Sequence, residues 1–338
     1  DQFVIIGLKA RQEHGNSRPS RRAGDPRHTP VSAFQASGIQ ERQPEMAIFQ
    51  GSITALITPF KDGKVDEKGF QSFVAWQIAE GIDGVVPCGT TGESPTLSHD
   101  EHKRVVELCI EVAKGKVPVI AGTGSNSTDE AIDLTQHAQK AGADAALIVL
   151  PYYNKPTPEG QYQHFKAIHD STNLPIFIYN VPPRSAVDMS VDTMARLAKL
   201  PRIVGVKDAT ADLARPIRTK LAIDKEFMML SGEDATALPF LAQGGIGCIS
   251  VTSNVAPRLT AEMHRAWRAG DLKKAMQINE RLLPVSDAMF CETSPGPVKY
   301  AASLLGRSSE ELRLPLAPIA EASRQKVKAA MTKAGLIN

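Results

Sequence analysis

Residues 117–150 read VPVIAGTGSNSTDEAIDLTQHAQKAGADAALIVL and contain one full repeat of the pattern that decides the fold. A short apolar run, 117–121, leads into a turn rich in Gly, Ser and Thr, and residues 128–141 then place apolar side chains at three- and four-residue spacing. A second apolar run, 145–150, follows. Apolar runs that alternate with helix-period segments predict parallel strands covered by helices.

This unit recurs along the chain from Met46 onward. The eight apolar runs are 53–58, 84–88, 117–121, 145–150, 176–180, 203–208, 227–231 and 247–251. Eight repeats predict an α/β fold of the (β/α)8 type, a TIM barrel, over residues 46–270. An open doubly wound sheet is the rival fold, but no run opens on a G-x-G-x-x-G turn with an acidic residue at the expected distance.

Helices are expected both between the strands and after the barrel. Segments 67–80, 99–113, 128–141, 158–171 and 256–269 have helical spacing, and Ser98, Ser127 and Ser190 stand where N-cap residues belong. Three further helices, over 275–283, 298–305 and 319–334, predict a C-terminal three-helix extension within a helical region spanning 271–338.

Residues 1–45 differ in composition from the rest of the chain. Arg, Ser, Gly and Pro are scattered there without a sustained apolar period, which predicts a disordered N-terminal extension that precedes the start of the domain at Met46. A transit peptide is the alternative, and the acidic residues of the segment count against it.

The charge balance excludes several classes of protein. The chain holds 39 Lys and Arg against 37 Asp and Glu, and from Met46 onward the two signs are equal in number, so no basic nucleic-acid footprint is expected. No apolar run approaches the roughly 20 residues of a membrane span. Four widely spaced cysteines predict reduced thiols in a cytoplasmic enzyme; Cys88 and Cys248 lie near strand ends, where a reactive thiol is the less favoured alternative.

Lys207 is the residue that points to chemistry. It follows Ile203-Val204-Gly205-Val206 and is the one lysine embedded in a predicted apolar strand, at the end where TIM barrels carry their active sites. Burial disfavours an ammonium, so a free amine able to attack a ketone is expected. The alternative is a salt bridge with Asp208, which the alternation of side chains along a strand argues against.

Tyr179, at the end of the neighbouring strand, is positioned to exchange protons with a Schiff base on Lys207, and Thr90 could relay them. On residue type alone Tyr179 could equally be a half-buried structural tyrosine. The turn from Gly89 to Gly92 can expose backbone N–H groups and threonine hydroxyls to a substrate carboxylate.

Metal chemistry is not expected, because His99 and His102 lack zinc-site spacing and suit a solvated helix start. Tyr152 and Tyr153, bracketed by Pro151 and Pro156, suggest an oligomer contact.

Five motifs together make the chain resemble the pyruvate-dependent class I lyase family of N-acetylneuraminate lyase and dihydrodipicolinate synthase. They are GTTGES (89–94), PYYNKP (151–156), YNVPPR (179–184), GVKDAT (205–210) and SGED (231–234). The resemblance spans Met46 to about the C-terminus. Ser185 and Asp208 replace the threonine and glutamate frequent in the family.

The resemblance implies roles for individual residues. Lys207 would bind pyruvate as an imine without a cofactor, Tyr179 would be the acid/base, and Thr90 and Tyr153 would complete a proton relay. In the family the second tyrosine comes from a neighbouring subunit, which implies a dimer as the minimal unit and a homotetramer built as a dimer of dimers. Carboxylate and pocket contacts would come from Thr91, Gly232 and Ile249.

Arg184 decides between branches of the family, because an arginine at this point of the motif suits the carboxylate of L-aspartate 4-semialdehyde. The resemblance therefore implies condensation of pyruvate with that aldehyde. A keto-deoxy-sugar-acid or N-acetylneuraminate-type aldolase is the alternative, and a non-catalytic amino-acid-binding barrel is a more distant one.

The resemblance also implies a feedback site for L-lysine between subunits. Its residues would be Ser94, His99, His102, Asn126, Glu130 and Tyr152. Pro95 departs from the small residue that is common at that position.

Overall fold

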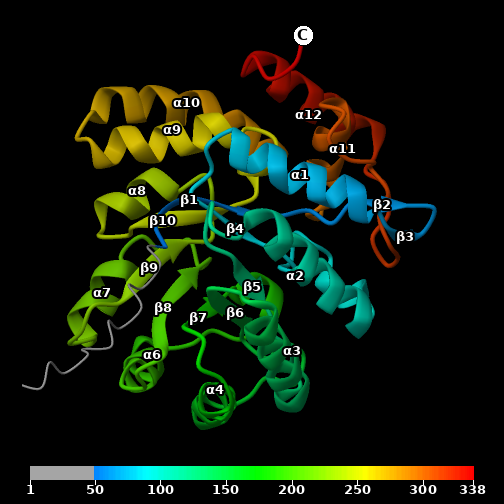
Figure 1. Ribbon diagram of the computed structural model, residues 1–338. Helices are drawn as coiled ribbons and strands as arrows, with labels where there is room; N and C mark the ends of the chain where they lie inside the picture. The colour runs from blue at the N-terminus through cyan, green and yellow to red at the C-terminus, as the bar shows by residue number, and fades with distance from the viewer. Residues whose placement is uncertain (1–48) are drawn as a thin grey trace, which may run out of the picture. The chain divides into compact units, whose positions relative to one another are not determined.

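A computed structural model describes residues 49–338 (Figure 1). The predicted extension over residues 1–45 lies outside the described residues. The barrel strands are β1 (Gly51–Ala55), β4 (Gly84–Val86), β5 (Ile120–Gly122), β6 (Ala145–Val149), β7 (Ile176–Asn180), β8 (Ile203–Asp208), β9 (Met228–Ser231) and β10 (Gly247–Ser250). All pair in parallel in the order β4-β1-β10-β9-β8-β7-β6-β5, and a bridge between Val85 and Val119 joins β4 to β5. The predicted (β/α)8 barrel is confirmed.

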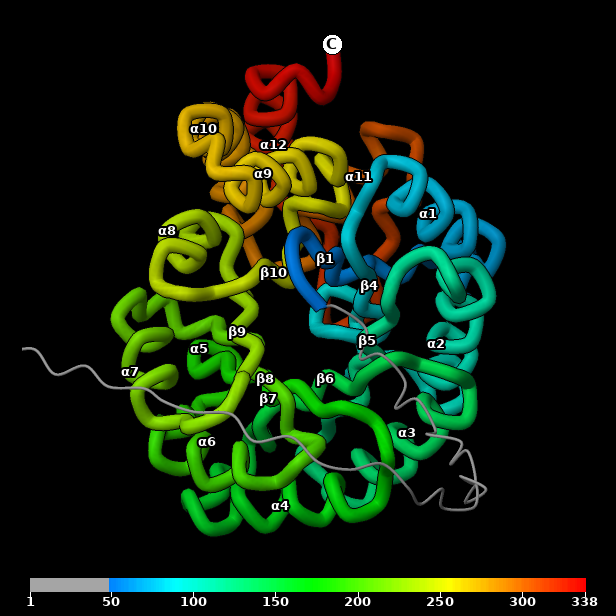
Figure 2. The backbone as a smooth tube through the Cα atoms, turned by 60° about the vertical axis from the view of Figure 1, so that its left-hand side comes forward, coloured from blue at the N-terminus to red at the C-terminus, as the bar shows by residue number. Residues whose placement is uncertain are grey.

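Helices surround the strands, as Figure 2 shows. The barrel helices are α1 (Glu67–Ala79), α2 (His99–Ala113), α3 (Thr128–Ala141), α4 (Pro158–Ser171), α6 (Val191–Ala198), α7 (Arg215–Ala222), α8 (Ala237–Ala242) and α9 (Pro257–Arg268), with a single turn α5 (Pro182–Ser185) after β7. The 3-10 turns η1 (Ser94–Thr96) and η2 (Thr252–Asn254) follow β4 and β10. Ser98, Ser127 and Ser190 accept hydrogen bonds at the helix starts where the sequence predicted caps.

The predicted C-terminal helices are α10 (Leu272–Ala288), α11 (Gly296–Leu304) and α12 (Glu321–Lys333). Helix α10 packs along α9, and α12 contacts both α10 and α11 (Figure 1). Helix α10 runs past the predicted end at residue 283, because Pro284 is accommodated inside it. The predicted boundary after residue 270 falls between α9 and α10.

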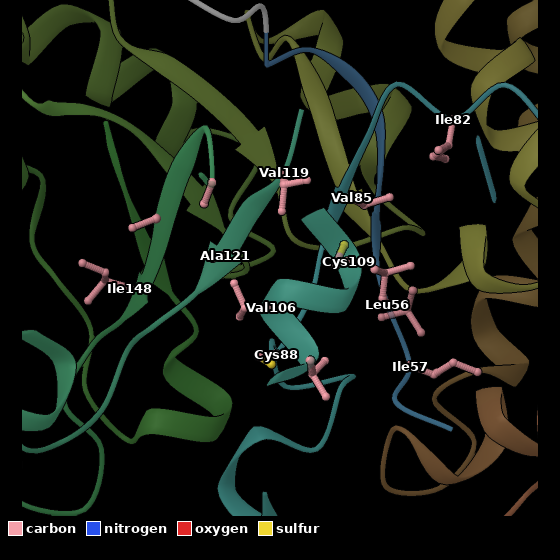
Figure 3. Close-up of a cluster of buried hydrophobic side chains, with 14 of the residues drawn as sticks. Leu56, Ile57, Ile82, Val85, Cys88, Val106, Cys109, Val119, Ala121 and Ile148 are labelled. Atoms are coloured by element: carbon pink, nitrogen blue, oxygen red, sulfur yellow. The ribbon is translucent and has the colours of Figure 1, made fainter. Parts of the chain in front are cut away.

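Two apolar layers hold the barrel together. The inner layer draws on every strand and includes Ile53, Phe177, Tyr179, Leu230 and Ile249, all buried. The outer layer lies between strands and helices, and Figure 3 shows Val106 and Cys109 of α2 beside strand residues of β4 and β5. Successive strand residues therefore face opposite layers, as the pleat requires.

Strand β8 departs from this alternation at one residue. Ile176 pairs with Ile203, but Phe177 pairs with Gly205, so Val204 is an extra residue, a β-bulge. A side chain at Gly205 would lie 2.6 Å from the Phe177 ring, and glycine is therefore required there. The bulge shifts the alternation by one residue, so that Val206 faces the helices and Lys207 faces the barrel interior.

Several further details differ from the sequence prediction. The first strand begins and ends earlier than residues 53–58, and Ile57 instead donates its N–H to the Asn254 side chain at 3.0 Å. Strand β5 begins three residues later than residue 117. A short hairpin, β2 (Phe60–Lys61) and β3 (Lys64–Val65), was not predicted, although its Asp62-Gly63 turn is a recognised hairpin signal.

The buried His264 on α9 gives the fold a pH dependence. Burial lowers its pKa from 6.5 to about 3, and the nearby Arg268 adds to the effect. Because the folded-state pKa lies below the unfolded one, this contribution to stability is present above pH 6.5 and is lost as pH falls toward 3. At pH 5 the loss amounts to about 2 kcal/mol.

We expect His264→Met to lose about 2 kcal/mol less unfolding free energy than the wild type when pH falls from 7 to 5. Urea unfolding at both pH values measures it, and pH 7 to 8 serves as the control range in which the two proteins should run parallel. Equal losses in both proteins between pH 7 and 5 would contradict this assignment.

Candidate functional site

Lys207 and Tyr179 meet inside the barrel. They are paired in register on β8 and β7, and both are buried, with 5% and 7% of their surface exposed. The Lys207 amine lies 4.2 Å from the centre of the Tyr179 ring. Among residues 49–338 no carboxylate lies within ion-pair distance of this amine. The arrangement is that of a buried amine beside a phenol, as the sequence predicted.

The alternative salt bridge between Lys207 and Asp208 is not formed. Asp208 accepts hydrogen bonds from the backbone and hydroxyl of Thr210 at 2.9 and 2.6 Å, and Arg215 lies 3.6 Å away. Burial raises the pKa of the Asp208 carboxyl despite these partners. The two neighbouring side chains point to opposite faces of β8, as expected.

Gly232 lies directly against Lys207. A side chain built there would come within 2.8 Å of Ala209 Cβ and 3.1 Å of Lys207 Cε, so a larger residue would press on Ala209 and crowd the lysine. Gly232 also donates its N–H to the Asp208 carbonyl at 2.6 Å. Ile249 is fully buried on β10 in the same inner layer as Tyr179.

The turn from Gly89 to Glu93 holds the two threonines. The N–H of Gly92 donates to the Gly89 carbonyl and that of Glu93 to the Thr90 carbonyl, both at 3.1 Å. Thr91 is buried, whereas Thr90 is half-buried. Of the two threonine side chains, that of Thr90 is therefore the more accessible.

A cavity of about 430 Å³ opens beside Thr90. Arg184 and Ser185 also line it. Thr90 and Arg184, both assigned to the reaction, therefore share one cavity. One guanidinium nitrogen of Arg184 donates to the Ser294 carbonyl at 3.4 Å, which leaves the rest of this exposed side chain free for another partner. Lys207 and Tyr179 do not line this cavity; they lie among the buried residues of the barrel interior.

Most of the residues implied for the lysine site line the same cavity. They are Ser94, His99, His102, Glu130 and Tyr152, together with Pro95. Asn126 does not line it; the Asn126 carbonyl accepts from the Asn154 side chain at 2.9 Å.

Glu130 is the charged centre of this group. One carboxylate oxygen contacts His99 Nε2 at 2.5 Å and the other accepts from the Ser125 hydroxyl. These hydrogen bonds lower the pKa of Glu130, the Ser125 hydroxyl being the stronger cause. Burial raises the pKa of the Tyr152 phenol and lowers that of His102 to about 4. A carboxylate beside hydroxyl and imidazole groups is a suitable partner for an ammonium group.

Tyr153 stands apart from the other predicted relay residues. Its side chain is 90% exposed, and its backbone has a φ of 70°, in the left-handed region. It does not line the cavity of its own chain.

The cysteine alternative is not supported. Cys88 and Cys248 are buried, and burial raises the pKa of both thiols well above 9. A thiolate nucleophile is therefore disfavoured at either position. Within residues 49–338 no group of three or more His, Cys, Asp or Glu side chains is placed to hold a metal ion, and no helix is long and apolar enough to cross a membrane.

Three supporting residues, Lys299, Glu93 and Asp234, were given no role by the sequence analysis, although Glu93 and Asp234 stand in the GTTGES and SGED motifs. Lys299 on α11 forms a fully buried ion pair with Glu93 at 2.7 Å. Asp234 accepts the N–H groups of Val251 and Thr252 at 2.8 and 3.0 Å and so fixes the segment after β10. The signal for Lys299 was present, since a lone lysine stands in an otherwise apolar helix pattern.

Comparison with known proteins finds close relatives of this chain. A family model described as the dihydrodipicolinate synthetase family matches residues 48–334. A curated protein of Rhodospirillum centenum, named 4-hydroxy-tetrahydrodipicolinate synthase, is 65% identical over 86% of this chain and 100% of its own.

Two solved structures share the fold at similar coverage. The chloride-inhibited dihydrodipicolinate synthase of Acinetobacter baumannii, complexed with pyruvate, has a TM-score of 0.83 and 47% identity over 85% of this chain and 99% of its own. The enzyme of Cyanidioschyzon merolae with lysine bound has a TM-score of 0.83 and 38% identity over 86% and 99% of the two chains. The chain belongs to the dihydrodipicolinate synthetase family.

Proposed function

We propose that the chain condenses pyruvate with L-aspartate 4-semialdehyde through an imine on Lys207. The product is 4-hydroxy-tetrahydrodipicolinate, in the diaminopimelate route to lysine. The observation that carries the proposal is the buried, carboxylate-free amine of Lys207 beside Tyr179. The synthase name of the curated relatives supports the same activity.

The amine of Lys207 attacks the ketone carbon of pyruvate, and the carbinolamine loses water to give the imine. Loss of a methyl proton turns the imine into an enamine, whose carbon attacks the aldehyde of the second substrate. The substrate amine then attacks the imine carbon, closes the ring and releases Lys207. The iminium supplies the electron sink, so the proposal needs no metal or cofactor.

Proton transfer is assigned to Tyr179, with Thr90 as the relay toward the cavity. Tyr153 would complete the relay in a second copy of the chain, which its 90% exposed side chain supports. A dimer is then the minimal active unit, and a homotetramer made of two such dimers is the proposed assembly.

Substrate positioning is assigned to polar groups around the amine. Thr91 and the backbones of Gly232 and Ile249 would seat pyruvate, and Arg184 would bind the carboxylate of the aldehyde substrate. The free guanidinium face of Arg184 at the cavity suits a bidentate contact with a carboxylate.

The alternatives are less favoured. A sugar-acid aldolase has no amino-acid substrate whose carboxylate Arg184 would bind. The curated relatives also carry the synthase name. A non-catalytic barrel would leave the Lys207 and Tyr179 pair without a use. A cytoplasmic location remains a prediction from the sequence.

Feedback by L-lysine is proposed at the cavity wall around Glu130. The ammonium of lysine would meet the Glu130 carboxylate, with His99 and Tyr152 beside it. A relative whose structure holds bound lysine supports lysine binding in this family, and Asn126 would join the proposed site in the assembled dimer.

Reduction with borohydride in the presence of pyruvate should add a pyruvate-derived mass to the tryptic peptide that holds Lys207. Lys207→Arg should give no adduct and lose activity on the order of 1000-fold or more, because a guanidinium stays protonated. Mass spectrometry and steady-state turnover measure the two effects. An adduct on another lysine of the wild type would refute the mechanism.

Arg184→Ala should reduce kcat/KM for L-aspartate 4-semialdehyde by about 10- to 100-fold through loss of a charged hydrogen bond. Trapping of pyruvate on Lys207 should be unchanged, since Arg184 does not touch that amine. Arg196→Ala, which removes an exposed arginine paired with Glu159 on the outer helices, is the matched control. Unchanged kinetics with the aldehyde would exclude the assigned role of Arg184.

Glu130→Gln should raise the lysine concentration needed for half-inhibition by about 10-fold or more, because a carboxylate partner of the ammonium is lost. Asp133→Asn is the matched control: it lies one turn further along α3, pairs with Lys103 at 2.8 Å and does not line the cavity. Equal effects of the two substitutions on inhibition would contradict the site.

A further inference from the structure

Lys299 on α11, in the C-terminal helical region, forms an ion pair with the turn that carries Thr90 and Thr91. The side chains of Lys299 and Glu93 have no exposed surface, and the Lys299 amine lies 2.7 Å from Glu93 Oε1. The same amine donates to the Thr58 carbonyl at 2.9 Å and lies 4.2 Å from the centre of the Phe60 ring. Lys299 thus ties α11 to two segments of the barrel mouth.

A buried ion pair of this kind is poor evidence for a role in stability. Removing two charges from water costs free energy that their attraction offsets only in part, and apolar replacements of such pairs are often neutral or stabilising. The role of the pair is therefore to be found in the residues that it holds in position.

What it positions is the turn that carries Thr90 and Thr91. Glu93 ends this turn with a φ of 55°, a left-handed conformation that is unfavourable for a residue with a side chain. Both of its carboxylate oxygens bind the C-terminal region: one meets Lys299, and the other accepts the Arg313 N–H at 3.1 Å. The strained end of the turn is held in place from outside the barrel.

Thr58 holds the turn a second time. Its hydroxyl donates to the Gly92 carbonyl at 2.8 Å, while its own carbonyl accepts from Lys299. The Lys299 ammonium therefore holds the turn in two ways. It pairs directly with Glu93, and through Thr58 it is linked to Gly92, the residue before Glu93.

The segment that precedes α11 contacts a second part of the site, Arg184. Ser294, buried and five positions before Lys299, accepts the hydrogen bond from Arg184. The C-terminal region thus contacts both the threonine turn and the arginine assigned to the second substrate.

We propose that Lys299 is a positioning residue for the condensation: it acts through Glu93 and Thr58 to hold Thr90 and Thr91 at the geometry that proton relay and carboxylate binding require. This inference rests on the proposed function. It also makes the C-terminal helical region part of the active centre, although none of its residues touches Lys207.

The test compares three variants. Lys299→Met removes the charge, Lys299→Met with Glu93→Gln removes the whole pair, and Val298→Ala deletes core volume at the neighbouring, fully buried position of α11. Each is measured for thermal stability, for kcat and KM with both substrates well below the unfolding temperature, and for borohydride-trapped pyruvate on Lys207.

Lys299→Met should lower kcat about 10- to 100-fold, because displacements of about 1 Å in a catalytic group have effects of this size. Pyruvate should still be trapped on Lys207. The double variant should recover stability, since no unpaired carboxylate stays buried, but its kcat should remain low because the turn is released. Val298→Ala should lose stability and keep kcat within about twofold, since it changes core packing alone.

Two results would overturn the inference. One is a kcat of both Lys299 variants within twofold of Val298→Ala; the other is a double variant that recovers kcat together with stability. If Lys299→Met alone fails to fold, the double variant decides. Failure of the proposed function itself is recognised separately, as absence of trapped pyruvate on Lys207 in the wild type.

Discussion

The β-bulge at Val204 turns Lys207 toward the barrel interior, and the site depends on that turn. Without the extra residue the alternation that begins at Ile203 would direct Lys207 at the surrounding helices. With it, the amine lies among apolar side chains against Tyr179 and Gly232. Glycine suits positions 205 and 232 for a related reason: a side chain at 205 would collide with Met228 and Phe177 of the neighbouring strands, and one at 232 would press on Ala209 and Lys207.

Three carboxylates near the site are paired with groups other than Lys207. Asp208, next in sequence to Lys207, is occupied by Thr210 and Arg215 on the other face of the strand. Glu93 is paired with Lys299 beside the threonine turn, and Glu130, which lines the cavity, contacts His99. Among the described residues no carboxylate lies within ion-pair distance of the catalytic amine. That separation explains how one small region can hold so many ionisable groups and keep an amine available for a ketone.

Sequence patterns predicted the elements whose signals are local. The capping serines at 98, 127 and 190 and the bounds of α2, α3 and α4 agree with the structure, because capping and apolar spacing act within a few residues. The pairing of Lys207 with Tyr179 could be predicted because strand ends of a barrel converge, whereas Thr90 lines a cavity that neither of them lines. Features that depend on distant partners could not: the bulge at Val204 appears only against β7, and Lys299 gains meaning only when Glu93 is beside it. The end of β1 is set by Asn254, nearly 200 residues away.

The central claim is a covalent bond between one lysine and the ketone carbon of pyruvate. Protein labelled with ¹⁵N at the lysine side-chain nitrogen and mixed with [2-¹³C]pyruvate tests it by NMR. The account predicts a one-bond coupling between the labelled carbon and a single lysine nitrogen, which disappears in Lys207→Arg. Absence of that coupling at saturating pyruvate, or its persistence in the variant, would contradict it.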